Sequence, residues 1–220
     1  MCPAFDKSDE GRRTMKIPLS YQRTEYDCGP TSFLNAISFL FHREDIPPDV
    51  LRYVMMYTLD SYNDKGEAYK KGTSQMAMAF LAGWLKQYAR ATNFPIECEY
   101  LGDEQVQLSE NSRVTAALQQ GGAVVLRVHY GCWHFVTLTG ITGSSVHLFD
   151  PYYRKRPFKE TGIELITDKP CSANRQVSMK ILNQTTKGVY TMGPNEGRTA
   201  VLLFNTNTRK TPERTIEYFV

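Results

Sequence analysis

The spacing of apolar residues changes part-way along the chain, and this change most constrains the fold. Up to about residue 91, apolar side chains recur at the three- and four-residue intervals of amphipathic helices. From residue 123 onward, β-branched and aromatic runs are separated by Gly, Ser or Asn, which is typical of short strands and turns. Helices followed by an antiparallel sheet indicate an α+β domain whose helices and strands are segregated.

The same patterns give approximate bounds for each element. Helices are expected at 31–41, 47–59, 73–91 and 112–120, and strands at 96–100, 123–130, 133–141, 145–150 and 199–204. The first helix is apolar on most sides, which predicts a buried, central position. Residues 1–15 are expected to form a flexible segment and residues 16–220 a single domain. The segment 155–198 gives no readable pattern.

Charge and composition narrow the classes of function. A formal net charge of +3 without a basic stripe argues against nucleic acid as a partner. No apolar run is long enough to span a bilayer, and the first residues lack the layout of a secretory signal. The five cysteines are odd in number and irregularly spaced, so we interpret them as free thiols in a reducing compartment, the cytoplasm. The oligomeric state cannot be inferred.

Cys28 is the cysteine best placed for chemistry. It lies at the predicted start of the most buried helix, just before Gly29 and Pro30. The helix dipole and free backbone N–H groups at such a position stabilise a thiolate. Gly29 removes side-chain bulk beside the sulfur, which leaves room for an acyl group to approach.

A hairpin supplies a candidate base for Cys28. If the turn between the strands at 133–141 and 145–150 is centred near Thr142, antiparallel pairing places His134 opposite Asp150 on the same face. The carboxylate of Asp150 would then hold Nδ1 of His134 and aim Nε2 at the sulfur. A register slip of one residue would destroy this pairing.

Gln22 is a candidate oxyanion donor. It comes six positions before Cys28, and the intervening turn can fold its amide back toward the sulfur. Together with the backbone N–H of Cys28, this amide would give a developing oxyanion two donors. The four residues thus provide a nucleophile, a base, an orienting carboxylate and an oxyanion hole.

Two motifs carry a resemblance to a known family. The run from Gln22 to Ser32 (QRTEYDCGPTS) resembles the start of the active-site helix in papain-clan cysteine peptidases. It is most similar to the bacteriocin-processing peptidases that cut after double-glycine leaders, and to their free-standing relatives. The later runs GCWHFV at 131–136 and LFDP at 148–151 resemble the histidine and aspartate motifs of that family.

The resemblance implies a papain-like α+β fold, with the active site in the cleft between a helical half and an antiparallel β-sheet half. It covers roughly residues 17–153 and assigns Cys28, His134 and Asp150 as the triad, with Gln22 as oxyanion donor. It also implies hydrolysis of a peptide or another amide bond through an acyl-enzyme on Cys28, without a cofactor. The membrane helices and ATPase domain of the transporter-linked members have no counterpart here, so the substrate is not carried over.

Other interpretations stay open for each residue. Cys28 could be a buried helix cysteine that packs as a small hydrophobe, and Asp150 before Pro151 could start a turn. His134 could be a structural histidine. Cys132 and His134 could form a metal pair, although Cys-x-His is an awkward spacing for tetrahedral zinc and no second pair is evident, so we assign no metal.

Two alternative functions stay open as well. The same site could transfer the acyl group to an amine or thiol in place of water. A chain of this kind could also keep the fold as a binding module and have lost turnover. All four site residues are present, which favours the enzyme.

Overall fold

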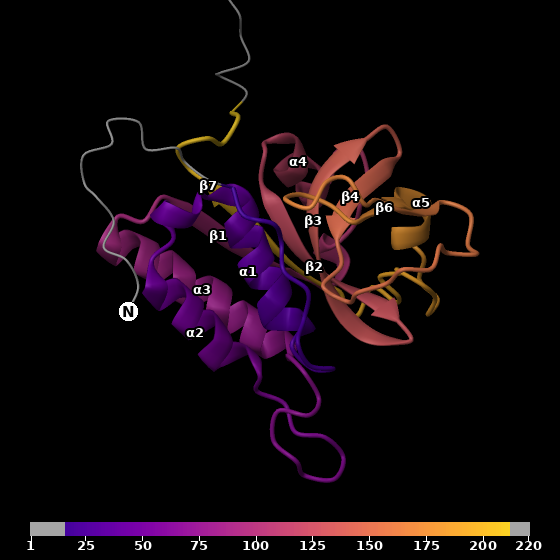
Figure 1. Ribbon diagram of the computed structural model, residues 1–220, viewed down its shortest axis with the longest axis horizontal. Helices are drawn as coiled ribbons and strands as arrows, with labels where there is room; N and C mark the ends of the chain where they lie inside the picture. The colour runs from indigo at the N-terminus through magenta and orange to yellow at the C-terminus, as the bar shows by residue number, and fades with distance from the viewer. Residues whose placement is uncertain (1–15, 212–220) are drawn as a thin grey trace, which may run out of the picture.

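A seven-stranded antiparallel sheet forms the backbone of the fold in this computed structural model, which describes residues 16–211 (Figure 1). The order across the sheet is β1-β7-β2-β3-β4-β6-β5. The strands are β1 (Ile96–Gly102), β2 (Ala123–Tyr130), β3 (Cys132–Thr142), β4 (Ser145–Phe149), β5 (Ile163–Leu165), β6 (Arg175–Ser178) and β7 (Thr199–Asn205). The expected α+β class is confirmed.

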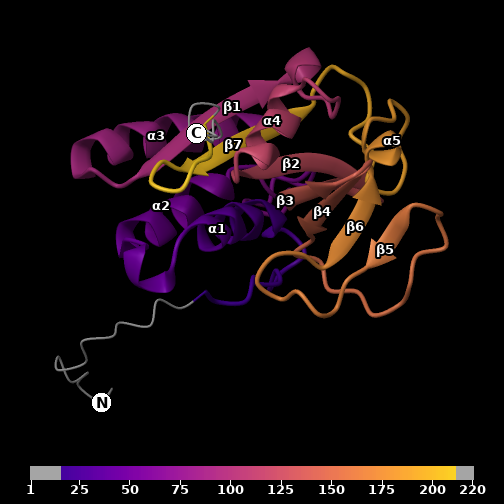
Figure 2. The same ribbon diagram turned by 90° about the horizontal axis from the view of Figure 1, so that it is seen from above.

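Three helices gather against one end of this sheet, as Figure 2 shows from above. They are α1 (Cys28–Leu40), α2 (Pro48–Thr58) and α3 (Gln75–Thr92), and two shorter helices follow, α4 (Arg113–Gln119) and α5 (Met179–Leu182). Single 3₁₀ turns lie at Arg43–Asp45 and Asp103–Gln105. The four expected helices are present, and α1 begins at Cys28, three residues before the apolar stretch 31–41 that predicted it.

Two apolar cores lie on opposite faces of the sheet. Strand β2 contributes to both, because Val124 and Leu126 pack on one face while Ala123 and Val125 pack on the other. The helices α1, α2 and α3 cover the second face, and α4 covers the first. Burial on both faces explains why β2 reads as a nearly continuous apolar run in the sequence.

Helix α1 is fixed to β3 by two reciprocal hydrogen bonds. The Ser32 hydroxyl donates to the Phe135 carbonyl (2.8 Å), and the Thr137 hydroxyl donates to the Ser32 carbonyl (2.8 Å). All three residues are buried, where hydrogen bonds are costly to leave unmade. This contact holds the start of α1 beside the start of β3, which is where Cys28 and His134 lie.

The segment 155–198 contains β5, β6 and α5, which the sequence did not predict. Each has only three or four residues, too few for a helix or strand period to emerge. In the described part of the chain, none of the helices is long and apolar enough to cross a membrane. The expected flexible segment 1–15 lies outside the described residues, and so do residues 212–220.

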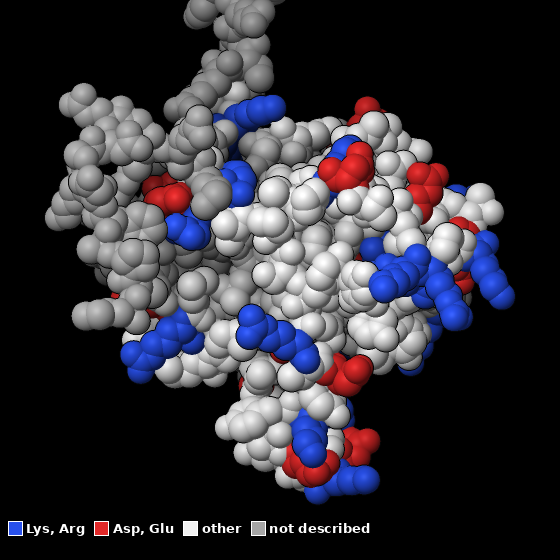
Figure 3. Space-filling view, viewed as in Figure 1, with Lys and Arg blue, Asp and Glu red and all other residues white. Residues whose placement is uncertain are grey.

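Charged side chains do not form one continuous surface on the face drawn in Figure 3, whose centre is largely uncharged. Several basic residues follow Asp150 in a loop, and one of them, Arg154, is hydrogen-bonded within that loop. Arg154 donates to the Tyr130 hydroxyl (2.8 Å) and to the carbonyls of Arg156 and Pro157, and it stacks on Phe158. Arg154 therefore serves the packing of this loop.

Candidate active site

The loop before α1 places Cys28 as the first residue of that helix. The Asp27 carboxylate folds this loop by accepting hydrogen bonds from the backbone N–H groups of Arg23 and Thr24 (3.0 and 2.7 Å). Burial alone would raise the pKa of Asp27, but these hydrogen bonds outweigh burial and lower the pKa below its usual value. The Asp27 side chain does not cap α1, so the positive end of the helix faces Cys28 and can stabilise a thiolate.

Gly29 is required for close packing of the start of α1 against the segment before α3. A Cβ atom added to Gly29 would overlap the side chain of Thr73. Thr73 comes just before Ser74, whose hydroxyl caps α3 by accepting a hydrogen bond from the Ala77 N–H (3.0 Å). A side chain larger than hydrogen at Gly29 would therefore force Thr73 and the start of α3 to move.

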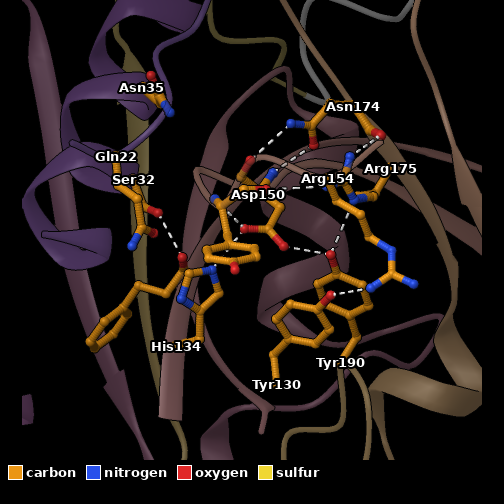
Figure 4. Close-up of polar contacts among 12 residues, drawn as sticks. Gln22, Ser32, Asn35, Tyr130, His134, Asp150, Arg154, Asn174, Arg175 and Tyr190 are labelled. Carbon is orange, nitrogen blue, oxygen red and sulfur yellow. Dashed lines mark hydrogen bonds and ion pairs between the residues drawn. The ribbon is translucent and has the colours of Figure 1, made fainter. Parts of the chain in front are cut away.

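His134 and Asp150 are in contact, with the imidazole ring turned opposite to the expected way. His134 Nε2 lies 2.7 Å from Asp150 Oδ1, so Nδ1 is the nitrogen left for the sulfur (Figure 4). His134 is 6% exposed and Asp150 is fully buried. Nε2 is the ring nitrogen farther from the backbone, and it reaches a carboxylate that lies diagonally across the hairpin.

The diagonal placement comes from the register of β3 with β4. The turn lies at Gly143-Ser144, with Thr142 paired to Ser145, and a β-bulge interrupts the pairing between Leu138 and Gly140. Beyond the bulge Thr137 pairs with Phe149, and extending this register puts Asp150 opposite Val136. The expected direct pairing of His134 with Asp150 was therefore wrong.

The bulge nevertheless keeps His134 and Asp150 on one face of the hairpin. Without the bulge, Asp150 would pair with Thr137, an odd number of residues from His134. Successive side chains of a strand point to opposite faces, so the carboxylate would then point away from the imidazole. One extra residue in β3 restores the alternation, and a bulge beside an active site is a common device for aiming a side chain.

The buried side chains of His134 and Asp150 stabilise each other's charged forms. Burial alone would lower the pKa of His134, but hydrogen bonds to Asp150 and Cys28, with the charges of both groups, raise it to about 10. Burial would likewise raise the pKa of Asp150, yet the hydrogen bond from His134, helped by those from Tyr190 and the Tyr152 N–H, keeps it below its usual value. The result is a buried carboxylate–imidazolium pair next to a thiol.

Gln22 lies beside the site, and its side-chain amide is hydrogen-bonded to its own loop. Its backbone N–H donates to the carbonyl of Pro151 (2.9 Å), which ties Gln22 to the residue after Asp150. Its side-chain Nε2 donates to the Thr24 carbonyl (2.8 Å), and its Oε1 is buried without a hydrogen-bond partner in the described chain. Figure 4 shows Gln22 on the α1 side of the His134–Asp150 pair.

Three residues around Asp150 were not predicted from the sequence. The Asn174 side chain clamps the Asp150 backbone, accepting from its N–H (2.7 Å) and donating to its carbonyl (2.8 Å). The Tyr190 hydroxyl contacts Asp150 Oδ2 (2.5 Å), and Arg175 in turn contacts Tyr190. These residues follow Asp150 by 24 to 40 positions in a segment without periodicity, and no local pattern in the sequence points to them.

The other described cysteines are differently placed. Cys98 is buried in β1, where burial raises the pKa of its thiol far above the ordinary value. Cys132 is exposed and Cys171 is partly exposed. A metal pair of Cys132 with His134 would have to use Nδ1 of His134, because Nε2 faces Asp150.

A cavity of about 470 Å³ lies near the site, although none of Gln22, Cys28, His134 and Asp150 lines it. Its lining includes Tyr21 next to Gln22, Phe149 next to Asp150, and Asn174. Tyr153 lies at its edge with its ring 5.0 Å from that of Tyr21. Apolar and aromatic groups with a few polar ones are the usual lining of a ligand pocket.

Comparison with known proteins agrees with these features. A family model described as the Peptidase_C39 like family matches residues 14–169, which include Gln22, Cys28, His134 and Asp150. The match ends before Asn174, Arg175 and Tyr190. A search of curated proteins finds no match to this chain.

Proposed function

Because this chain belongs to the Peptidase_C39-like family, we propose that it is a cysteine hydrolase that cleaves a peptide or another amide bond. Cys28 is the nucleophile, His134 the base and Asp150 its orienting carboxylate. Family membership alone suggests a cysteine peptidase. The observation that carries the assignment is the buried His134, which binds Asp150 through Nε2 and leaves Nδ1 for the Cys28 thiol.

The mechanism follows from this arrangement. The Cys28 thiolate attacks the substrate carbonyl carbon, and the resulting tetrahedral oxyanion collapses when the leaving amine takes a proton from His134. Water then enters, gives a proton back to His134 and attacks the thioester carbon. Release of the carboxylic acid restores the thiolate. Asp150 stays ionised throughout and holds the imidazolium in one orientation.

A cavity near the site supports a substrate larger than a single amide group. Its lining includes Tyr21 and Phe149, the chain neighbours of Gln22 and Asp150, and none of the four site residues themselves. Its aromatic rim and volume of about 470 Å³ suit an apolar side chain or a short peptide segment.

The rate of Cys28 alkylation by iodoacetamide tests the proposal without a known substrate. At pH 6 an ordinary thiol is only about 0.3% ionised, so we expect Cys28 to react on the order of 100-fold faster than an ordinary thiol. Peptide mass spectrometry reads each cysteine separately. Cys132 is the internal control, because it is exposed whereas Cys28 is only 8% exposed.

The variant His134→Ala should remove this advantage and leave Cys132 alkylation unchanged. Circular dichroism would establish that the variant is folded. A wild-type Cys28 that reacts no faster than Cys132 at pH 6 would overturn the proposal and favour a binding module on the same fold.

Gln22→Ala is expected to lower kcat/KM by about 100-fold, the usual cost of losing one oxyanion donor. The Gln22 Nε2 carries two hydrogens, so it can keep its hydrogen bond to the Thr24 carbonyl and offer the second hydrogen to the oxyanion. Alkylation of Cys28 forms no oxyanion, so its rate should be nearly the same in Gln22→Ala as in the wild type. A loss of kcat/KM smaller than about threefold would exclude Gln22 from the oxyanion hole.

A further inference from the structure

The second oxygen of Asp150 has one hydrogen-bond partner among the described residues. Oδ1 accepts from His134 Nε2 (2.7 Å) and from the Tyr152 N–H (2.7 Å). Oδ2 faces the Tyr190 hydroxyl at 2.5 Å. A fully buried carboxylate is costly unless its oxygens are hydrogen-bonded, so this hydroxyl supports the ionised state of Asp150 alongside the larger contribution of His134.

Arg175 fixes the direction of that hydrogen bond. A phenol hydroxyl can donate one hydrogen bond and accept others, whereas a guanidinium can only donate. Arg175 Nε donates to the Tyr190 oxygen (3.2 Å), so the hydroxyl hydrogen is left for Asp150. The guanidinium is itself held by the carbonyls of Asn174 (2.8 Å) and Tyr152 (3.2 Å).

The Tyr190 ring cannot easily move away from this position. It is fully buried, and it stacks on Tyr130 with centroids 5.3 Å apart and an interplanar angle of 3°. Phe158 contacts its edge. The Tyr190 backbone N–H donates to the His129 carbonyl (2.8 Å), which attaches Tyr190 to β2. Burial and the charge of Asp150 raise the pKa of Tyr190 well above its ordinary value, so it remains a donor in the working pH range.

We propose that Tyr190 is a positioning residue for the reaction: its hydroxyl, oriented by Arg175, keeps Asp150 ionised with Oδ1 directed at His134. The inference rests on the proposed function, since it concerns how the base of that site is held. Tyr190 acts only through Asp150 and contacts neither the thiol nor the substrate in this role. It lies 21 residues beyond the end of the family match.

The variant Tyr190→Phe tests this role because it removes the hydroxyl and keeps the ring. Asp150 would then lose a donor to Oδ2 and ionise less readily. In a plot of the Cys28 alkylation rate against pH, the acid limb is the range in which the rate falls as the pH is lowered. This acid limb should therefore move to higher pH. With a peptide substrate, kcat should fall by roughly 10- to 100-fold, the value of a hydrogen bond to a charged group, with KM nearly unchanged.

Tyr130→Phe is the matched control. It removes a hydroxyl from the other ring of the same stack, and that hydroxyl contacts Arg154 and not Asp150. We expect the acid limb of this variant to coincide with that of the wild type. A purely structural role for Tyr190 would lower the unfolding temperature of Tyr190→Phe without moving the acid limb, and that result would overturn the inference.

The alkylation rate of Cys28 in the wild-type protein shows whether the proposed function fails or only the role of Tyr190 fails. If wild-type Cys28 lacks fast alkylation at pH 6, the proposed function fails and the role of Tyr190 fails with it. If the wild type reacts fast and Tyr190→Phe has the same acid limb, only the role of Tyr190 fails. Should Tyr190→Phe not fold, Arg175→Lys is the second variant. It loosens the orientation of the hydroxyl, so a smaller shift in the same direction is expected, and no shift overturns the inference.

Discussion

Replacing Cys28 by serine is expected to lower kcat/KM by about 10⁴-fold or more. A serine hydroxyl in this position stays protonated, whereas a thiol next to an imidazolium can ionise before attack. The shape of the side chain is almost unchanged, and α1 should therefore keep its contacts with β3. Hydrolysis of the best substrate from a peptide-library screen with the wild-type protein is the measurement.

Cys132→Ser is the matched control for this experiment. Cys132 is an exposed thiol two residues from His134, so its loss should leave kcat/KM unchanged. If Cys28→Ser retained a tenth of the wild-type activity, the nucleophile would have to be sought elsewhere. If both variants lost activity equally, the assignment of Cys28 would also be in doubt.

Asp150→Asn is expected to lower kcat/KM by about 10³- to 10⁴-fold, as loss of a buried orienting carboxylate can. An amide has no charge to stabilise the imidazolium, and it can present an N–H to the ring in place of an acceptor. The Asn174 side chain binds the backbone of residue 150 and not its carboxylate, so the local chain path should survive. Retention of more than a tenth of wild-type kcat/KM would exclude Asp150 as the orienting group.

The same variant should change the pH dependence of activity in a definite direction. The pKa of His134 is raised to about 10, with Asp150 the first of the groups that raise it. The wild-type imidazolium should thus persist well above pH 7, and the alkaline limb of kcat/KM should lie toward pH 10. In Asp150→Asn that limb should move down toward the ordinary histidine value of about 6.5.

The stability of the folded protein should depend on pH through the same two groups, His134 and Asp150. A raised pKa of His134 stabilises the folded protein fully below about pH 6.5, and this contribution is lost as the pH rises toward 10. A lowered pKa of Asp150 contributes above about pH 4 and is lost as the pH falls. The free energy of unfolding of the wild type should therefore exceed that of Asp150→Asn most between about pH 4 and 6.5, as urea titrations would measure.

The residue types of the candidate site could be predicted because each has a local signal. Cys28 before Gly29-Pro30 indicates a helix start, and the strand periods around His134 and Asp150 predict a hairpin. The structure agrees with both, since Cys28 begins α1 and the hairpin brings the imidazole to the carboxylate. Local signals were sufficient wherever an element was long enough to show its period.

The geometry within the hairpin could not be predicted in the same way. The bulge near Thr139 adds one residue to β3, and its one local sign is the neighbouring Gly140, which does not by itself fix the register. The register, and hence the nitrogen that meets Asp150, depends on this one residue. The contacts of Asn174 with Asp150 and of Arg175 with Tyr190 depend on long-range packing of very short elements. The spacing of apolar residues in the sequence gives no sign of such contacts.

The position of β7 has a consequence for the order of events during synthesis. This strand lies between β1 and β2 and contributes Val201 and Leu203 to the core beneath α1. A ribosome adds residues 199–205 more than 170 residues after Cys28, as translation runs from the N-terminus. We therefore expect a nascent chain to carry this thiol without a working site until β7 has been made.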